Sequence, residues 1–328
     1  MASSDTVLVT GAGGFIGSHL VEALLREGRS VRAFVRYNGR GDTGNLRHVP
    51  ADVRSGVEVV FGDLRDPDAV LDAARGVDVI HHLGALIGIP YSYVHPRETV
   101  DTNVTGTLNV LAAARERGVR RVVHTSTSEV YGTARTVPIT EEHPLQGQSP
   151  YSASKIGADM LADSFFRAFG VPVVTIRPFN TYGPRQSARA VIPTVIVQAL
   201  TGEVVRLGSL SPTRDLNFVA DTVDGFLRAG RVPGVEGRVM NLARDEEISV
   251  GALAEKIVAI VGRPVRIETE ASRLRPEASE VMRLRGDSTL ARRLLDWKPT
   301  VDLDEGLRRT VAWIAEHLDA YAGAGYQV

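Results

Sequence analysis

Residues 7–20 read VLVTGAGGFIGSHL, and this stretch decides the fold. A short aliphatic run leads into a glycine-rich turn, and an amphipathic segment follows. Glycine permits a tight turn and a close backbone approach to a pyrophosphate, whose charge is stabilised by the N-terminus of the next helix. Many glycine-rich loops are only tight turns, but a strand before and a helix after this one predict dinucleotide binding. The residues expected at the cofactor are Gly11, Gly14, Phe15, Ile16 and Gly17, of which the glycines have the spacing G-x-x-G-x-x-G.

Strand-like and helix-like segments alternate along most of the chain. β-branched runs typical of buried parallel strands follow at residues 30–35, 57–62, 77–83, 121–128 and 171–178. Amphipathic segments typical of helices occupy residues 15–28, 66–76, 102–118 and 149–170, and a later one spans 192–200. This alternation predicts an α/β fold, a Rossmann-type doubly wound parallel sheet. We expect a dinucleotide-binding domain over 1–180 and a smaller, substrate-binding C-terminal lobe over 181–328, with some later segments returning to the first domain.

The composition excludes several classes of protein. The 328 residues carry a net charge of −1, so no basic field is available for nucleic acid. There is no cysteine, which excludes disulfides and thiolate metal sites. We see neither a basic leader with a long apolar core nor a stretch of membrane-spanning length, and we expect a soluble, cytoplasmic protein. His81 and His82 are consecutive on a predicted strand and point to opposite faces, so no metal site is predicted.

The ends of the second and third predicted strands bear on the choice of cofactor. An acidic residue after the second strand would bind the ribose hydroxyls of NAD, but residues 34–38 read FVRYN. Arg36 matches a ribose 2′-phosphate, so we favour NADP over NAD. Arg36 stacked on adenine would instead leave NAD possible. Asp63 and Leu64 follow the third strand, where Asp63 either contacts adenine or caps the next helix.

Two further motifs predict proton-transfer chemistry. SPYSASK, residues 149–155, places Tyr151 and Lys155 one turn apart on a predicted helix. A lysine ammonium beside a phenol, next to an oxidised nicotinamide, stabilises the phenolate that can take a proton from an alcohol. TSTSEVYG, residues 125–132, supplies Thr127, Ser128 and Glu129 at the end of the fifth strand. A solvated helix face and a polar turn are the ordinary alternatives, but both motifs follow the glycine loop in one chain.

Together these motifs resemble the extended short-chain dehydrogenase/reductase family, over essentially the whole chain. RPFNTYGPR at 177–185 and TRDLNFV at 213–219 are similar to its nucleotide-sugar epimerases, dehydratases and decarboxylases. ALIGIPYSY, TSTSEVYGTA, PLQGQSPYSASKIGAD and RPFNTYGPRQSARAVIPT most resemble the 4,6-dehydratases of the legionaminic acid pathway, which act on GDP-N-acetylglucosamine. The resemblance implies a tightly bound, recycled NAD(P)+, a nucleotide-diphosphate-sugar substrate and a homodimer.

The resemblance also assigns roles to residues. Tyr151 would deprotonate the sugar 4-OH, with Lys155 as its partner, and Thr127 would hydrogen-bond that hydroxyl. Glu129 would remove the C5 proton, water would leave from C6 and hydride would return there, giving a 4-keto-6-deoxy sugar nucleotide. Further cofactor contacts are expected from Leu83, Ala85 and Pro178. The expected substrate contacts, besides Thr127, are Tyr91, Tyr93, Asn180, Arg185, Arg214 and Arg275. The two tyrosines could instead pack the lobes together.

The sequence differs from part of the family within TSTSEVYG, residues 125–132. The dTDP-glucose dehydratases carry Asp-Glu after the threonine, whereas this chain has Ser128 and Glu129. GDP-mannose dehydratases resemble the chain here, with Thr-Ser-Glu and an arginine after the second strand. UDP-glucuronate decarboxylases share the triplet, so it does not separate the two reactions. A 4-epimerase does not need Glu129, and a non-catalytic NAD(P) sensor does not need Thr127, Tyr151 and Lys155.

Overall fold

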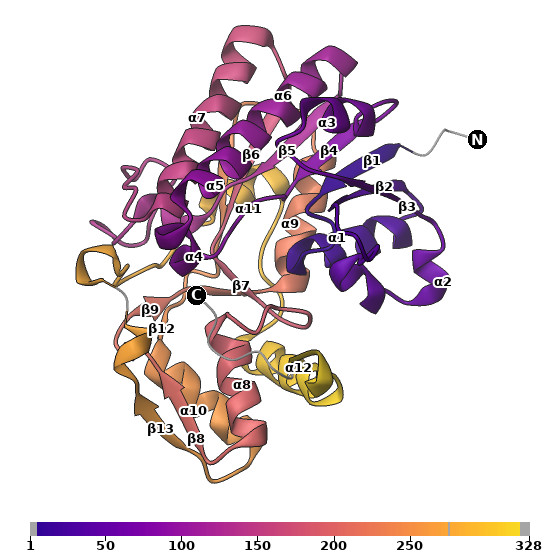
Figure 1. The fold of residues 1–328 in the computed structure, drawn as a ribbon. Coiled ribbons are helices and arrows are strands. Elements are labelled where there is room, and N and C mark those ends of the chain that lie inside the picture. Colours follow the sequence, from indigo (N-terminus) through magenta and orange to yellow (C-terminus); the bar gives the residue numbers. More distant parts are fainter. Residues whose placement is uncertain (1–4, 275, 322–328) are drawn as a thin grey trace.

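A seven-stranded parallel sheet forms the centre of the computed structural model, which describes residues 5–274 and 276–321 (Figure 1). The strand order is β11-β6-β5-β4-β1-β2-β3, with neighbours parallel throughout. The chain steps outward from β1 in one direction to β3 and then crosses back to β4, which is the doubly wound arrangement that the sequence predicts. The strands are β1 Thr6–Thr10, β2 Ser30–Arg36, β3 Val57–Gly62, β4 Val79–His82, β5 Arg121–Thr125, β6 Val173–Pro178 and β11 Val239–Leu242.

Helices cover both faces of the sheet because the strands bury alternate side chains in opposite directions. Val7 and Val9 of β1 lie in one hydrophobic cluster with Leu20 of α1, and Leu8 lies in another with Leu111 of α6. Figure 1 shows α1 and α9 on one face and α3, α6 and α7 on the other. The helices around the sheet are α1 Phe15–Arg26, α2 Ala51–Arg54, α3 Pro67–Ala73, α4 Ile89–Val94, α5 Pro96–Val100, α6 Gly106–Arg117, α7 Pro150–Phe169, α9 Val219–Arg231 and α11 Thr289–Leu295.

The predicted helices have the expected positions with small differences at their ends. The segment predicted at 102–118 begins as a π-helical turn, Asp101–Thr105, and becomes α6 at Gly106. Gly118 and Gly170 follow α6 and α7 with φ of 64° and 69°, the left-handed conformation in which glycine ends a helix without steric strain. The helix predicted at 192–200 is α8, Val191–Thr201.

Segments after residue 180 contribute to both parts of the molecule. α9 packs against α1, and β11 pairs with β6 as an edge strand of the main sheet. The remaining segments form a smaller group of helices and two-stranded sheets at the bottom of Figure 1. That group contains β7 Asn180–Tyr182, α8, β8 Val204–Leu207, β9 Thr213–Arg214, β10 Leu216–Phe218, β12 Ile248–Ser249, α10 Val250–Val261, β13 Arg266–Thr269 and α12 Leu303–Glu316. The division into domains at residue 180 stays a prediction.

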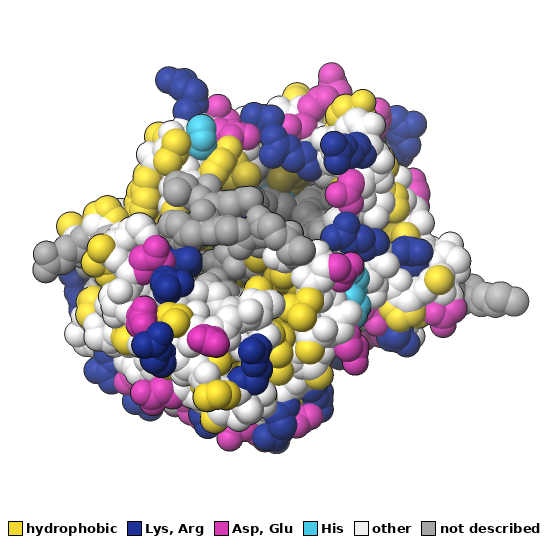
Figure 2. Space-filling view, turned by 60° about the horizontal axis from the view of Figure 1, so that its bottom comes forward, with side chains coloured by type: hydrophobic (Ala, Val, Ile, Leu, Met, Phe, Trp, Pro, Cys, Tyr) yellow, Lys and Arg dark blue, Asp and Glu magenta, His cyan; other side chains and the backbone are white. Residues whose placement is uncertain are grey.

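The surface is consistent with the near-zero net charge. Figure 2 shows basic and acidic side chains interspersed on one face, without a broad field of either sign. Within residues 5–274 and 276–321, no helix is long and apolar enough to cross a membrane. The same residues contain no group of three or more metal-ligating side chains that could hold an ion.

Candidate active site

The glycine loop between β1 and α1 is packed too closely for larger residues. A Cβ atom on Gly11 would lie 2.7 Å from the backbone nitrogen of Gly84, and one on Gly17 would lie 2.2 Å from the Gly11 carbonyl oxygen. Gly11 also has a φ of +69°, which disfavours a side chain. Gly14 caps α1, and no described side chain accepts a hydrogen bond from the first turn of this helix. The first N–H groups of α1 are therefore available to an anion, and the loop fits a dinucleotide pyrophosphate.

The end of β4 lies against this loop. The Thr10 hydroxyl is 2.8 Å from His82 Nδ1 and accepts a hydrogen bond from the Gly84 backbone at 3.1 Å. A Cβ on Gly84 would come within 2.6 Å of Leu64 Cδ1, so Leu64 packs directly under this turn. The predicted cofactor residues at 64 and 83–85 are therefore neighbours of the glycine loop. The sequence motifs do not predict a role for Thr10. Its position at the end of the first strand, with a hydroxyl side chain, is the feature of the sequence that could have indicated one.

A charged cluster surrounds the end of β2. Arg36 is 64% exposed, and its Nη2 lies 3.4 Å from Glu98 Oε1. Asp63 accepts hydrogen bonds from the Arg65 backbone and guanidinium, and these bonds hold the pKa of Asp63 below its usual range. The alternative that Asp63 caps α3 is wrong, because Asp66 is the capping residue and accepts from the backbone of the first turn. Arg36 is thus exposed at the place where a ribose phosphate is expected.

The catalytic candidates meet where β5 ends and α7 begins. Thr127 caps the short 3-10 helix Ser128–Tyr131, and its Oγ1 accepts from the Glu129 backbone at 3.2 Å. Ser149 caps the start of α7, which fixes the position of Tyr151 in the first turn. The side chains of Thr127 and Glu129 lie close enough to Tyr151 to affect the pKa of its hydroxyl. The tertiary structure therefore brings Thr127, Glu129 and Tyr151 together from two separate motifs, and Ser128 between them is buried.

Burial determines the acidity of the tyrosine–lysine pair. The Lys155 ammonium donates to the Thr125 carbonyl oxygen at 2.6 Å, and burial lowers the pKa of Lys155 to about 8. Burial raises the pKa of Tyr151, and the Thr127 side chain opposes this effect while the nearby Glu129 and Asp159 charges add to it. The chain alone therefore favours the protonated phenol. A phenolate at Tyr151 requires an additional positive charge in the site, which an oxidised nicotinamide carries.

The predicted substrate residues have different surroundings. The buried Asn180 Nδ2 has no hydrogen-bond partner among the described residues, so it is a donor that a ligand oxygen could satisfy. Tyr91 donates to Glu98 at 2.5 Å, and the Tyr93 hydroxyl lies 2.6 Å from Ser279 Oγ. The Tyr93 contact joins α4 to the segment around residue 279, which agrees with the lobe-packing alternative for this residue.

The predicted arginines and Pro178 are also distributed over several elements. Arg214 donates to the Val281 carbonyl oxygen at 2.8 Å and pairs with Glu280. Arg185 is buried and donates to Glu22 of α1 at 2.6 Å, so its charge is already paired within the protein. Pro178 ends β6, opposite Leu242 of β11. Arg275 lies outside the described residues. The substrate and cofactor roles of all these residues stay predictions.

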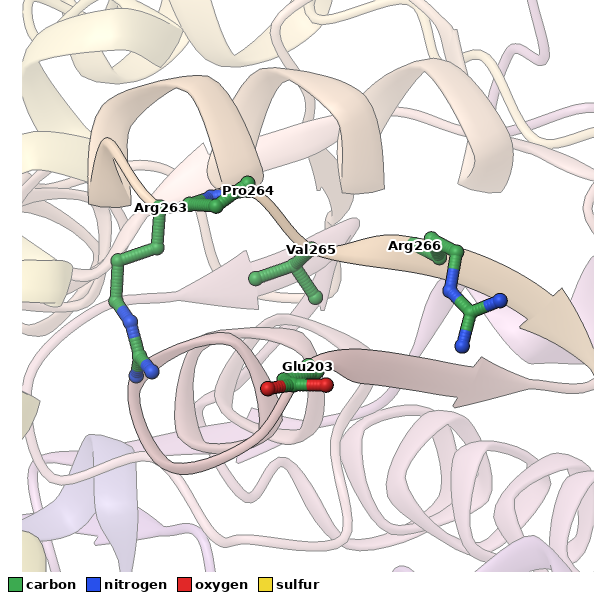
Figure 3. A pocket seen from close by; sticks show the side chains of 5 residues that line it. All are labelled: Glu203, Arg263, Pro264, Val265 and Arg266. Carbon is green, nitrogen blue, oxygen red and sulfur yellow. The ribbon is translucent and has the colours of Figure 1, made fainter.

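A surface hollow elsewhere on the molecule lies between the end of α10, β13 and β8 (Figure 3). Its lining side chains are Glu203, Arg263, Pro264, Val265 and Arg266. Arg263 already donates to the Ala199 carbonyl oxygen at 3.2 Å. The hollow shares no residue with the catalytic candidates, and we assign it no chemistry.

Comparison with known proteins shows the family. Residues 8–310 match the family described as GDP-mannose 4,6 dehydratase. The chain belongs to this family. A UDP-glucose 4-epimerase of Mycolicibacterium smegmatis is 37% identical over 310 residues, covering 93% of this chain and 96% of the relative. A dTDP-glucose 4,6-dehydratase of Streptomyces griseus is 37% identical over 320 residues, covering 95% and 94%.

Other relatives in the family widen the range of activities. A UDP-glucuronic acid decarboxylase 1 of Xenopus tropicalis is 32% identical over 329 residues, covering 98% of this chain and 74% of the relative. The crystal structure of the dTDP-glucose 4,6-dehydratase of Streptomyces venezuelae, with NAD and TYD bound, superimposes with a TM-score of 0.87 at 32% identity, covering 98% and 100%. The chain is thus an enzyme of the extended short-chain dehydrogenase/reductase nucleotide-sugar family, whose members include dehydratases, epimerases and decarboxylases. The family resemblance is confirmed at this level.

The buried Lys155 predicts a pH-dependent stability. Its pKa is about 8 in the folded protein and near 10.5 in an exposed lysine, so the unfolded chain binds this proton more tightly. The contribution of Lys155 to the free energy of unfolding therefore rises between about pH 8 and pH 10.5. We expect Lys155→Met to raise the unfolding temperature of the cofactor-free protein, relative to wild type, more at about pH 7 than at about pH 10.

Thermal unfolding at the two pH values measures this effect, and Lys298→Met is the matched control because Lys298 is exposed. The control should give the same difference from wild type at both pH values. An equal shift for Lys155→Met at both values would contradict the prediction.

Proposed function

We propose that this enzyme is an NAD(P)-dependent nucleotide-sugar 4,6-dehydratase. The observation that carries the proposal is the position of Glu129, whose backbone donates a hydrogen bond to Thr127 Oγ1 and whose charge lies near enough to Tyr151 to raise the pKa of that residue. A 4,6-dehydratase needs two bases at one sugar ring, one for the 4-hydroxyl and one for C5. Tyr151 at the start of α7 and Glu129 in the short helix after β5 are the two residues that we assign to these tasks.

Each protein group has a separate task in the proposed reaction. Tyr151 takes the proton of the sugar 4-OH, and Thr127 holds that oxygen in line with the phenol. The Lys155 ammonium supplies positive charge below Tyr151. A nicotinamide held at the glycine loop would supply the hydride-accepting and hydride-donating chemistry that C4 and C6 require. Glu129 removes the C5 proton, which the C4 ketone has made acidic, and the C6 hydroxyl leaves as water. The protons taken up by Tyr151 and Glu129 balance the one lost in that water and the one that C5 regains.

The substrate is a nucleotide-diphosphate sugar in this proposal. Among such sugars GDP-N-acetylglucosamine is the first candidate, because the motifs around Tyr91, Thr127, Tyr151 and Asn180 resemble those of enzymes that act on it. Asn180 Nδ2, a buried donor without a described partner, is suited to an oxygen of the sugar diphosphate. Decarboxylation of a nucleotide uronic acid is the second candidate, since a named relative is a UDP-glucuronic acid decarboxylase. A 4-epimerase and a non-catalytic NAD(P) sensor remain the alternatives to be tested.

A homodimer and a cytoplasmic location also belong to this proposal. Val100, Leu108 and Met160 are 43%, 39% and 51% exposed, and they lie on α5, α6 and α7, which pack side by side. Exposed apolar side chains on adjacent helices suit contact with a second copy.

Mass spectrometry after incubation with GDP-, UDP- and dTDP-sugars tests the reaction type. We expect loss of one water from a GDP-linked N-acetylhexosamine. Loss of carbon dioxide from a uronic acid would indicate the decarboxylase, and isomerisation without a mass change, detected by chromatography, would indicate the epimerase. If no sugar in the panel reacts while a dinucleotide still binds, the sensor alternative is favoured over catalysis.

Replacing Glu129 should separate the two halves of the reaction. Glu129→Gln keeps the shape of the side chain, but a neutral amide is a very poor base. Oxidation at C4 depends on Tyr151, Lys155 and Thr127 and should persist, whereas dehydration should fall by at least about 10²-fold. Rapid mixing with the substrate should therefore show absorbance of reduced nicotinamide that persists, with little dehydrated product.

Tyr151→Phe is the matched control, because removal of this hydroxyl should abolish both the absorbance change and the product. If Glu129→Gln forms product at the wild-type rate, Glu129 is a turn residue and the assignment is wrong. A decarboxylase would also retain its product in this variant, since a 4-keto uronic acid loses carbon dioxide without C5 deprotonation.

NADP is the cofactor we favour, because Arg36 is exposed at the end of β2 and no acidic residue follows this strand. Arg36→Ala should weaken NADP binding by about tenfold or more and change NAD binding little, since one charge-assisted pair to phosphate is lost. Calorimetric titration of the dinucleotide-free protein with each cofactor measures both affinities. Arg40→Ala, on the neighbouring exposed loop, is the control. Equal affinity of the wild type for the two cofactors, or a preference for NAD, would contradict this assignment.

A further inference from the structure

Asp159 is a buried carboxylate on the helix that carries Tyr151 and Lys155. The three residues are spaced four apart on α7, so they lie on one helix face. Asp159 is 3% exposed and takes part in four hydrogen bonds. Since a buried carboxylate is unfavourable unless it is well paired, these bonds account for its presence in the core. The partners are His124 Nε2 at 3.1 Å, Ser126 Oγ at 2.8 Å, Arg177 Nε at 3.1 Å and Arg177 Nη2 at 2.9 Å.

Thr127 and Glu129 lie in the catalytic turn, residues 126–131 after β5. Arg177 connects the Asp159 carboxylate to the C-terminal end of this turn. It lies on β6 and is 4% exposed. Two of its nitrogens donate to Asp159, and the third, Nη1, donates to the Tyr131 hydroxyl at 3.0 Å. Tyr131 in turn donates to Asn241 Oδ1 of β11 at 2.7 Å. The planar guanidinium can make these bonds together because its donors have a fixed geometry, which a lysine lacks.

The Asp159–Arg177 pair therefore holds both ends of one short segment. Asp159 is bonded to Ser126, which directly precedes Thr127. Arg177 is bonded to Tyr131, which follows Glu129 by two residues. We propose that Asp159 and Arg177 are positioning residues that fix Thr127 and Glu129 relative to Tyr151. The proposal rests on the proposed function for the roles of these three residues. Asp159 and Arg177 act on the reaction through the hydrogen bonds that hold Ser126 and Tyr131 and through the charges of their own side chains.

The charges around Asp159 give it a second effect on the site. Lys155 and Arg177 are buried cations, and Asp159 is the buried anion between them. Burial lowers the pKa of His124 and of the stacked His82, so both rings are neutral near pH 7. The Asp159 charge raises the proton affinity of both Lys155 and Tyr151. The titratable and charged groups that face this cluster are His82, His124, Glu129, Tyr131, Glu141, Tyr151, Lys155 and Arg177.

The link between Asp159 and Tyr131 can be measured without activity. The two residues share no direct hydrogen bond and are joined through Arg177. In a double-mutant cycle of unfolding temperature, Asp159→Asn and Tyr131→Phe should be non-additive. Asp163→Asn with Tyr182→Phe is the matched control pair, because Asp163 is exposed on the same helix and Tyr182 is a buried tyrosine of β7. If Asp159→Asn does not fold, Ser126→Ala takes its place, since it removes a single bond.

Two functional readouts separate positioning from general stability. Tyr131→Phe should slow dehydration by about tenfold or more and leave the initial reduction of the cofactor nearly unchanged, because it releases the end of the turn next to Glu129. Asp159→Asn should move both limbs of the pH–rate profile to lower pH, because a charge that favours protonation of Lys155 and Tyr151 is removed. Asp163→Asn should move neither limb.

Additive unfolding temperatures would overturn the proposal. So would an unmoved pH–rate profile in Asp159→Asn, or equal slowing of both half-reactions in Tyr131→Phe. The initial oxidation at C4 is common to the dehydratase, decarboxylase and epimerase alternatives, so the pH profile remains readable if dehydration is not the reaction. If the wild type oxidises no nucleotide sugar, the proposed function fails. The double-mutant cycle of unfolding temperature then decides by itself whether Asp159 and Tyr131 are linked or independent.

Discussion

The contact on which the site depends is the close packing of two backbones at the carboxyl ends of β1 and β4. Gly11 lies so near Gly84 that a methyl group at position 11 would overlap main-chain atoms. This approach brings the start of α1 beside the end of β4. Parallel strands end at the same edge of the sheet, so the turn after β5 lies at this edge as well. The glycine loop, the segment after β4 and the turn after β5 therefore share one region.

A second constraint is electrostatic and lies behind the catalytic turn. Tyr151 and Lys155 lie in a core that disfavours charge, which raises the pKa of the tyrosine and lowers that of the lysine. Asp159 and Arg177 are buried in the same core and satisfy one another with two hydrogen bonds. Breaking such a pair on one side leaves an uncompensated buried charge, which is strongly destabilising. The tyrosine–lysine pair and the neighbouring Asp159–Arg177 ion pair are thus parts of one buried arrangement.

The two regions of the molecule are joined by chain crossings. α9 and β11 come from the second half of the sequence, yet they pack on the main sheet and extend it. Tyr93 of α4 contacts Ser279, and Arg185 from the loop after β7 pairs with Glu22 of α1. Movement of the smaller group of elements relative to the sheet would have to break or rearrange these contacts. Asn180 begins β7, where it pairs with Leu216 of β10.

The sequence by itself determined the sheet, its flanking helices and the glycine loop, because alternation, helix-ending glycines and turn spacing are local properties of the chain. It also identified Tyr151 and Lys155, since a four-residue helical spacing predicts a shared face. Only the tertiary structure decided that Asp66 rather than Asp63 caps α3, that Arg185 faces Glu22, and that Asp159 meets Arg177 and Tyr131. Most of these partners come from elements far apart in the sequence. The packing of those elements decides which buried groups pair, and a local sequence pattern cannot predict that pairing.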